Sequence, residues 1–176
     1  MANPVTTPAP RQAVPWWTSR APARPDLVTV LRATLVCVVM LLLLAALGRM
    51  TGWLLFTAPL AATAMIVAGM PATPPAQPRS VVVGHLVSVA IGLAAGAAAD
   101  HSIWTGAVAA SLAMAAMVLT QSFHAPAAAT AALVVATHPV ALTALQDFAV
   151  GSVLVVVVGY LAGLMFPTAR YPTYWW

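Results

Sequence analysis

The sequence predicts an all-α polytopic transmembrane helical bundle, built from two tandem repeats of three segments each. Three observations lead to this fold class. The chain of 176 residues is 62% hydrophobic and only 6% charged, whereas a soluble domain carries about 25% charged residues. Its apolar residues fall into six stretches, separated by short polar or proline-rich connections. A phrase of the form F-x-A-P-x-A-A-T-A occurs twice, beginning at Phe56 and at Phe123.

The two ends of the chain differ from its middle. Residues 1–26 contain six prolines and three arginines, a composition typical of a polar tail that is disordered or extended. Trp16 and Trp17 either contact the lipid headgroup region, where Trp is enriched, or are incidental to a floppy tail. Residues 167–176 form an aromatic C-terminal tail suited to a membrane interface.

Between these tails, residues 27–166 form the predicted membrane domain. A helix needs about 20 apolar residues to cross a bilayer. Four segments meet this length and are expected to span: Leu27–Gly48, Ser80–Ala99, Ser102–Thr120 and Phe148–Phe166. The other two segments are short or have a proline near their start: Thr51–Met70 and Phe123–Thr137. Each is either a broken span or a re-entrant element, which needs protein or a wet cavity around its free backbone.

The positions of the arginines predict an orientation. If all six segments cross, six of the seven arginines lie on or near the N-terminal side, and only Arg49 lies opposite. Lys and Arg gather on the cytoplasmic side of membrane proteins. We therefore expect an integral protein of a bacterial plasma membrane with both termini in the cytoplasm. A chain with four spans satisfies the same rule less well.

The doubled phrase belongs to a longer repeat. Its two phenylalanines are 67 residues apart. The same offset pairs three glycines of the first half with three of the second half: Gly84 with Gly151, Gly92 with Gly159, and Gly96 with Gly163. We predict one repeat over about residues 27–97 and a second over about residues 98–166. Because each copy has an odd number of segments, the second copy lies upside down, as in many transporters. The alternative is an old duplication that only built a stable bundle.

The six paired glycines are predicted to be helix-packing positions. Gly84, Gly92 and Gly96 lie on one helix face together with Ser88, at steps of four residues. Small residues at this spacing let membrane helices approach closely. Packing therefore explains them better than direct contact with a ligand.

The proline phrase suggests an anion site. Proline suits the first position of a helix, so Pro59 and Pro126 are each expected to begin one. Small residues such as Ala128 leave the helix start open, and Thr63 and Thr130 add hydroxyl groups one turn further on. The N–H groups and positive dipole end of a helix start attract anions, so both starts could face one site. Alternatively, both prolines merely kink spanning helices.

Three further residues are candidates for the pathway. His85 lies in the second turn of the third segment, and His124 directly precedes the second Ala-Pro step. A polar side chain at membrane depth needs a partner or a wet cavity, so each histidine either makes a structural hydrogen bond or belongs to the pathway. Arg79 opens the third segment and either anchors it on the cytoplasmic side or attracts anions. Asp147 is interpreted as a cap at the start of the last segment.

Several classes of function are excluded by what the sequence lacks. It contains no P-loop, G-x-S-x-G motif, paired carboxylates or metal-ligand spacing, so we expect no enzyme, metal or cofactor. The pI near 10.3 reflects only three acids and not an Arg-rich stretch for nucleic acid. Cys37 stands alone and excludes an intrachain disulfide. The expected partner is the lipid bilayer, and the sequence is compatible with a homo-oligomer.

Two stretches resemble the HPP family of integral membrane proteins: PPAQPRSVVVGHLVS at Pro74–Ser88 and FHAPAAATAALV at Phe123–Val134. The resemblance covers roughly residues 27–166. The second stretch corresponds to the His-Pro-Pro triplet that names the family, and it reads His124-Ala125-Pro126 here. The resemblance implies a membrane domain usually described with four spans. It also implies an association with nitrite transport, which is attributed to members from chloroplasts and cyanobacteria.

Two functional hypotheses follow from these observations. The main one is passage of a small inorganic anion, with nitrite suggested by the resemblance, at the two Ala-Pro helix starts. The rival is a non-transporting structural or assembly protein on the same scaffold. A polar cavity joining the two helix starts favours transport, whereas a dry apolar interior favours the rival.

Overall fold

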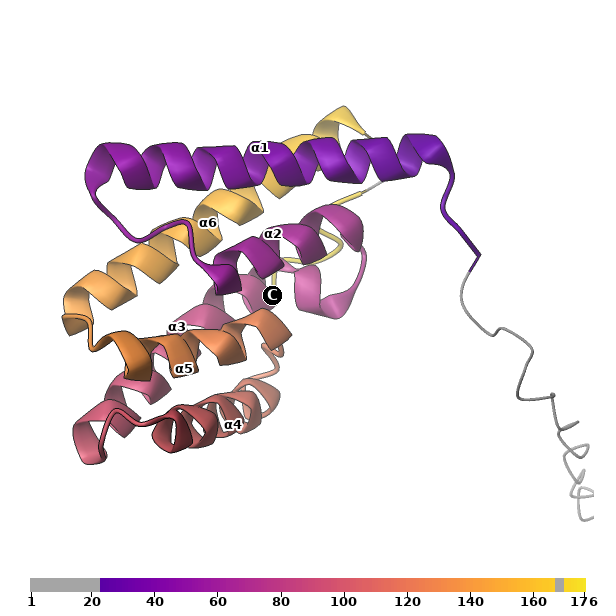
Figure 1. Ribbon diagram of the computed structural model, residues 1–176. Coiled ribbons are helices and arrows are strands. Elements are labelled where there is room, and N and C mark those ends of the chain that lie inside the picture. Colours follow the sequence, from indigo (N-terminus) through magenta and orange to yellow (C-terminus); the bar gives the residue numbers. More distant parts are fainter. Residues whose placement is uncertain (1–22, 167–169) are drawn as a thin grey trace, which may run out of the picture.

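The computed structural model describes residues 23–166 and 170–176. In this part of the chain, helices form the regular structure and no strand occurs (Figure 1). The elements are α1 (Leu27–Thr51), α2 (Ala58–Gly69), the 3₁₀ turn η1 (Pro74–Ala76), α3 (Pro78–Ala98), α4 (Ile103–Leu119), α5 (Ala125–Thr137) and α6 (Ala141–Met165). The predicted all-α fold is therefore confirmed. Most of the predicted N-terminal tail, including Trp16 and Trp17, lies outside the described residues, as does the start of the C-terminal tail.

Three of the described helices are long and apolar enough to cross a membrane. They are α1, α3 and α6, with mean hydropathies of 2.7, 2.0 and 2.3 over their best windows. Helix α4 has 17 residues and falls short of this length, so the count of four spans stays a prediction. Helices α2 and α5, with 12 and 13 residues, are short as the sequence indicated.

The short helices α2 and α5 lie inside the bundle, and α1 lies at its edge. Helix α1 runs along one side in Figure 1, and α4 lies on the opposite side. Helix α3 packs against α4, α5 and α6, while α2 packs against α1, α5 and α6. The start of α1 and the end of α6 lie at the same end of the bundle (Figure 1). Which side of a membrane holds that end stays a prediction.

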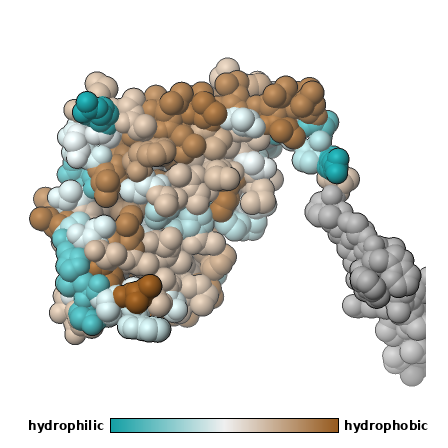
Figure 2. All heavy atoms as spheres, in the orientation of Figure 1, coloured by the Kyte–Doolittle hydropathy of each residue, from teal (hydrophilic) through white to brown (hydrophobic). Residues whose placement is uncertain are grey.

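The outer surface of α1 is apolar. Only Met40 and Leu44 of this helix are buried, and the remaining side chains form a hydrophobic band along the upper edge of Figure 2. Hydrophilic residues gather instead near the two ends of the helix (Figure 2). An exposed apolar area of this extent is suited to contact with lipid and not with water. The surface thus agrees with an integral membrane protein.

The second segment differs from the prediction of a helix over Thr51–Met70. Helix α1 continues to Thr51 and ends at Gly52, whose φ of 75° is left-handed. Glycine adopts this conformation without the steric cost that other residues meet. The chain then runs without helical structure through residues 53–57 before α2 begins. The segment is therefore a non-helical stretch followed by a short helix.

The sixth segment begins earlier than the predicted start at Phe148. Helix α6 starts at Ala141, directly after Pro139 and Val140, because the residues from 141 onward include the good helix formers Ala, Leu and Gln. The interpretation of Asp147 as a helix cap is therefore wrong. Asp147 lies in the second turn and is 5% exposed. Its Oδ1 atom has no hydrogen-bond partner among the described residues.

Gly84 and Gly92 lie where α3 meets α5 and the segment before it. A Cβ atom on Gly92 would lie 2.7 Å from the carbonyl oxygen of Ala131 and 2.9 Å from Cβ of Val134. A Cβ on Gly84 would lie 3.1 Å from Cβ of His124. No larger residue fits at Gly92 without moving the helices apart.

The glycines of α6 make the corresponding approach to α2. A Cβ on Gly151 would meet the side chain of Leu60, and one on Gly159 would lie 2.7 Å from Cγ1 of Val67. The last glycines of the two long helices each lie against a residue that follows their own helix: Gly96 against His101, and Gly163 against Tyr171.

Candidate functional site

Both Ala-Pro steps begin short helices. Pro59 and Pro126 occupy the second positions of α2 and α5. Proline fits there because the N–H groups of the first turn have no partner within the helix. The preceding residues, Thr57 and His124, are extended, with φ of −122° and −142°. The prolines therefore start helices and do not kink continuous spans.

Four side chains that the sequence singled out meet in the interior: Thr63 of α2, His85 of α3, His124 before α5, and Thr130 of α5. All four are fully buried. Thr63 Oγ1 lies 2.9 Å from His85 Nε2 and 2.8 Å from His124 Nε2. His85 Nδ1 lies 2.9 Å from Thr130 Oγ1. We call these four residues the His-Thr cluster.

Two backbone carbonyls anchor the His-Thr cluster. His124 Nδ1 lies 2.7 Å from the carbonyl oxygen of Pro75 in η1. Because a carbonyl only accepts, Nδ1 carries a hydrogen. Thr63 Oγ1 lies 2.9 Å from the carbonyl oxygen of Pro59, one turn earlier in α2. Phe148 of α6 stacks on the His85 ring with centroids 5.5 Å apart, so the cluster touches four helices and η1.

With both rings neutral, the hydrogen bonds of the cluster can run in one direction. Thr130 donates to His85 Nδ1, and His85 Nε2–H donates to Thr63. Thr63 then donates to His124 Nε2, and His124 Nδ1–H donates to Pro75. The carbonyl of Pro75 therefore sets the tautomer of both imidazoles.

The position of Arg79 at the start of α3 is explained by its contact with a neighbouring helix. Its Nη2 atom donates to the carbonyl oxygen of Thr120 at 2.9 Å, and Thr120 is the C-terminal cap of α4. A cation is favoured at a helix C-terminus and disfavoured at the start of its own helix. The guanidinium thus ties α3 to α4. Ala128 lies half-buried in the first turn of α5.

An apolar groove of about 480 Å³ lies beside the start of α2. On one side it is lined by Leu54, Thr57, Ala58 and Pro59, and on the other by Ala129, Ala132, Leu133 and Ala136 of α5. Thr57 supplies the one side-chain hydroxyl of this lining. The groove reaches the later turns of α5 and not Pro126. Its apolar lining favours the non-transporting alternative, whereas the buried cluster favours a polar pathway.

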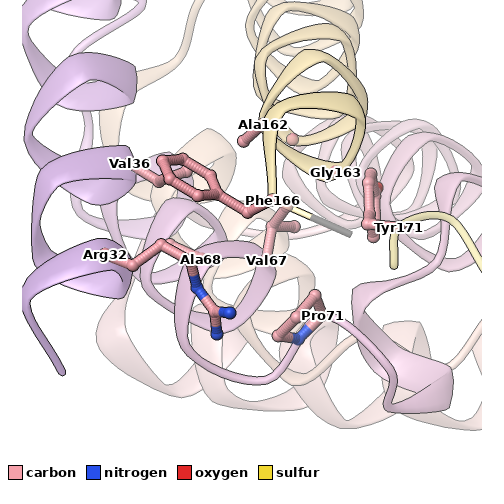
Figure 3. A pocket seen from close by; sticks show the side chains of 10 residues that line it. Arg32, Val36, Val67, Ala68, Pro71, Ala162, Gly163, Phe166 and Tyr171 are labelled. Carbon is pink, nitrogen blue, oxygen red and sulfur yellow. The ribbon is translucent and has the colours of Figure 1, made fainter. Parts of the chain in front are cut away.

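A smaller cavity lies beside the C-terminal segment. Arg32 and Val36 of α1, Val67 of α2, and Phe166 and Tyr171 line it, with their side chains converging in Figure 3. Its volume of about 20 Å³ holds about one water molecule. This cavity is therefore too small to be a substrate site.

The C-terminal segment is held against the bundle by Gln77. The Gln77 Nε2 group donates to the carbonyls of Pro71 and Thr73 at 2.8 and 2.9 Å, and its Oε1 accepts from the N–H of Thr173 at 2.8 Å. Tyr171 is 4% exposed, and this burial raises the pKa of its hydroxyl. Part of the predicted interface tail is therefore buried.

Gln77 and Asp147 are among the buried polar residues that sequence reasoning did not place in the interior. Gln77 gives no signal, because a glutamine in a proline-rich loop is ordinarily solvated. Asp147 does give one, since it is an acid that directly precedes a long apolar segment, where it was interpreted only as a cap. His101 lies before α4 and His138 caps the end of α5, and their rings are tilted by 34° with centroids 3.2 Å apart. No group of three or more metal-ligating residues occurs among the described residues.

Comparison with known proteins places the chain in a family. The profile of the HPP transmembrane region matches residues 22–172, which include the whole His-Thr cluster. A transmembrane protein of Dictyostelium discoideum is 31% identical over 127 residues, covering 66% of this chain and 40% of that protein. The chain therefore spans about two fifths of the length of this curated relative. No solved structure matches the chain. Because the family profile covers most of its length, the chain belongs to the HPP transmembrane family.

Proposed function

We propose that the chain passes a small inorganic anion across the membrane by way of the His-Thr cluster. The observation that carries this proposal is a fully buried, hydrogen-bonded polar cluster inside a bundle with an apolar exterior. Ionisable residues at membrane depth are costly and usually mark an ion or proton path. Nitrite is the anion suggested by the resemblance to transporting members of the family.

The helix starts support this placement. His124 is the N-cap of α5 and contacts Thr63 in the second turn of α2, so the first turns of both short helices lie near the cluster. A helix N-terminus carries a partial positive charge that attracts anions. The cluster adds polar side chains without a fixed charge, which suits an ion that must also leave.

The predicted inverted repeat is part of the same proposal. Gly92 packs on Val134, and Gly159 packs on Val67. The offset of 67 residues relates Gly92 to Gly159 and Val67 to Val134. Helix α5 packs on α3 as α2 packs on α6, and α4 packs on α3 as α1 packs on α6. These equivalences support a pseudo-twofold axis near the cluster, as in inverted-repeat transporters.

The second candidate function is a structural or assembly role without transport. The apolar groove beside the start of α2 favours it, because that groove offers a passing anion little polar surface. In this case the cluster serves only to tie α2, α3 and α5 together.

Nitrite uptake into proteoliposomes of the purified full chain tests the proposal. We expect uptake above that of protein-free liposomes, rising toward about pH 6, where an unperturbed histidine begins to protonate. His124→Gln keeps a hydrogen-bonding side chain but cannot be protonated, so this rise should disappear. The matched control His101→Gln, on the exposed connection before α4, should behave as the natural chain.

A variant that opposes the positive dipole end of α5 with a negative charge gives a second test. Ala128→Asp puts a negative charge into the first turn of α5, so nitrite uptake should be lost. A charge at membrane depth costs a few kcal/mol, so insertion and folding are checked by size-exclusion chromatography. Natural uptake by a well-folded Ala128→Asp protein would contradict the proposed anion site.

A further inference from the structure

We infer that the His-Thr cluster binds one proton together with each anion, on Nε2 of His124, so that the two move across the membrane in the same direction. The inference rests on the proposed anion passage and names its coupling ion. It follows from the hydrogen atoms that the cluster needs and from the charges around it.

The cluster is one hydrogen short when both imidazoles are neutral. Five close contacts each need a hydrogen: Thr130–His85, His85–Thr63, Thr63–His124, Thr63–Pro59 and His124–Pro75. The two hydroxyls and the two neutral rings supply one hydrogen each. The shortage falls on Thr63, whose hydroxyl lies 2.8 Å from His124 Nε2 and 2.9 Å from the Pro59 carbonyl.

One added proton completes all five hydrogen bonds. If it is bound at His124 Nε2, this nitrogen donates to Thr63, which also accepts from His85. Thr63 then turns its own hydrogen toward the Pro59 carbonyl, and His124 Nδ1 still donates to Pro75. A proton on His85 would instead leave the hydroxyl hydrogen of Thr130 without an acceptor. The hydroxyl hydrogen of Thr63 would still have two competing acceptors, His124 Nε2 and the Pro59 carbonyl. The geometry therefore selects His124.

The charges around the cluster oppose a proton that arrives alone. The His85 ring faces His124 with centroids 5.3 Å apart, and α2, α4 and α5 contain no Asp, Glu, Lys or Arg. The charged groups of the neighbouring helices are engaged or placed elsewhere: Arg79 bonds the end of α4, Arg32 lines the cavity of Figure 3, Arg49 is exposed, and Asp147 faces the backbone of Leu54. An uncompensated buried cation is costly.

An anion at the same place removes this cost. His124 is the N-cap of α5, where the helix dipole disfavours a cation and favours an anion. A monovalent anion beside His124 and the first turn of α5 neutralises the added proton and satisfies the dipole. Each ion therefore strengthens the binding of the other, and this coupling is reciprocal.

Isothermal titration calorimetry on the detergent-solubilised full chain tests the coupling, with sodium nitrite as the probe. Titrations near pH 7.5 in two buffers of different ionisation enthalpy give the number of protons taken up per nitrite. Where the free cluster is unprotonated, we expect about one proton per nitrite, and a tenfold weaker apparent affinity for each further unit of pH.

Variants locate the proton. His124→Gln should take up no proton with nitrite, whereas the control His101→Gln should keep the natural stoichiometry. If His124→Gln does not fold, the pH dependence of nitrite affinity in the natural chain decides alone, because a flat dependence overturns the inference.

Transport assays distinguish anion passage from its coupling to a proton. An inward proton gradient should drive nitrite accumulation beyond that in protein-free liposomes, which correct for nitrous acid that crosses lipid unaided. Nitrite binding without proton uptake would overturn the coupling and leave anion passage intact. Proton uptake that is retained in His124→Gln would overturn the assignment to this residue. Absence of both nitrite binding and flux would overturn the proposed function, and the coupling with it.

Discussion

Thr63 joins more of the interior than any other side chain of the His-Thr cluster, because its single hydroxyl lies within hydrogen-bonding distance of two imidazoles and one carbonyl. Replacing it leaves buried polar atoms without partners. The effect of that loss is the residue-scale test of whether the cluster stabilises the fold as well as serving transport.

Thr63→Val should lower the free energy of unfolding by about 1–3 kcal/mol, the cost of leaving a buried polar group unsatisfied. Nitrite uptake should fall to the level of protein-free liposomes, since the two rings lose their connection. Chemical denaturation in detergent and the uptake assay measure the two effects. The matched control is Thr137→Val, which removes an exposed hydroxyl bonded to the Leu133 carbonyl and should change stability by no more than about 0.5 kcal/mol. Equal effects of both variants would contradict a special role for Thr63.

At the scale of elements, one contact between helices and one helix start are most open to test. Helices α3 and α5 touch through Gly92, and the start of α4 is held by a small group of polar side chains. These features depend on different physics, close packing in the first case and charge-assisted hydrogen bonds in the second.

Gly92→Ala should destabilise the protein by about 1–3 kcal/mol, the usual cost of overpacking, because the added methyl group would lie 2.7 Å from the Ala131 carbonyl oxygen. The control Gly69→Ala adds a methyl group with nothing within 4 Å, so it should be neutral or gain up to about 1 kcal/mol from helix propensity. Thermal unfolding in detergent compares them. A neutral Gly92→Ala would show that α3 and α5 separate easily.

The start of α4 should weaken in acid. Asp100 Oδ1 accepts hydrogen bonds from Thr105 Oγ1 at 2.6 Å and Ser102 Oγ at 2.8 Å, and these bonds lower the pKa of Asp100. A lowered pKa gives stability that is present above the unfolded-state value of about 3.9 and lost as the pH falls through the folded-state value. The free energy of unfolding should therefore decrease below about pH 4 more in the natural chain than in Asp100→Asn. Parallel pH profiles would show that Asp100 does not contribute.

The whole molecule could be predicted in outline but not in its interior contacts. Hydropathy located all six segments, because each helix coincides with a continuous apolar stretch of the sequence. It misplaced the start of α2, since Gly52 and the non-helical residues after it are as apolar as a helix. It also misplaced the start of α6, where Asp147 looked like a cap. The residues of the His-Thr cluster were identified, but their mutual contacts join positions up to 61 residues apart and depend on packing that a single sequence does not display.

The attachment of the C-terminal segment is a test at this scale, because Gln77 connects it to the loop before α3. Gln77→Ala removes four hydrogen bonds, two of them to the C-terminal segment, and should release the residues around Thr173 from the bundle. Limited proteolysis followed by mass spectrometry should then show cleavage in this segment at least about tenfold faster, the change expected for a loss of about 1.4 kcal/mol in local stability. The control Gln146→Ala, in α6, should leave the cleavage rate unchanged. Unchanged cleavage in Gln77→Ala would mean that the packing of Tyr171 alone holds the segment.

The shortness of α2 and α5 has a consequence for biogenesis. Helix α1 is long enough to leave the translocon and enter lipid by itself, but a helix of 12 or 13 residues is not. The non-helical backbone before α2 carries polar groups that lipid tails leave unsatisfied, so this stretch has to remain in a protein or aqueous environment until its neighbours arrive. Helix α2 packs on α5 and α6, which are synthesised long after it. Ribosomes stalled before α5 should therefore hold α1 inserted and α2 unprotected, and quality-control proteases should cleave such intermediates within the α1–α2 connection.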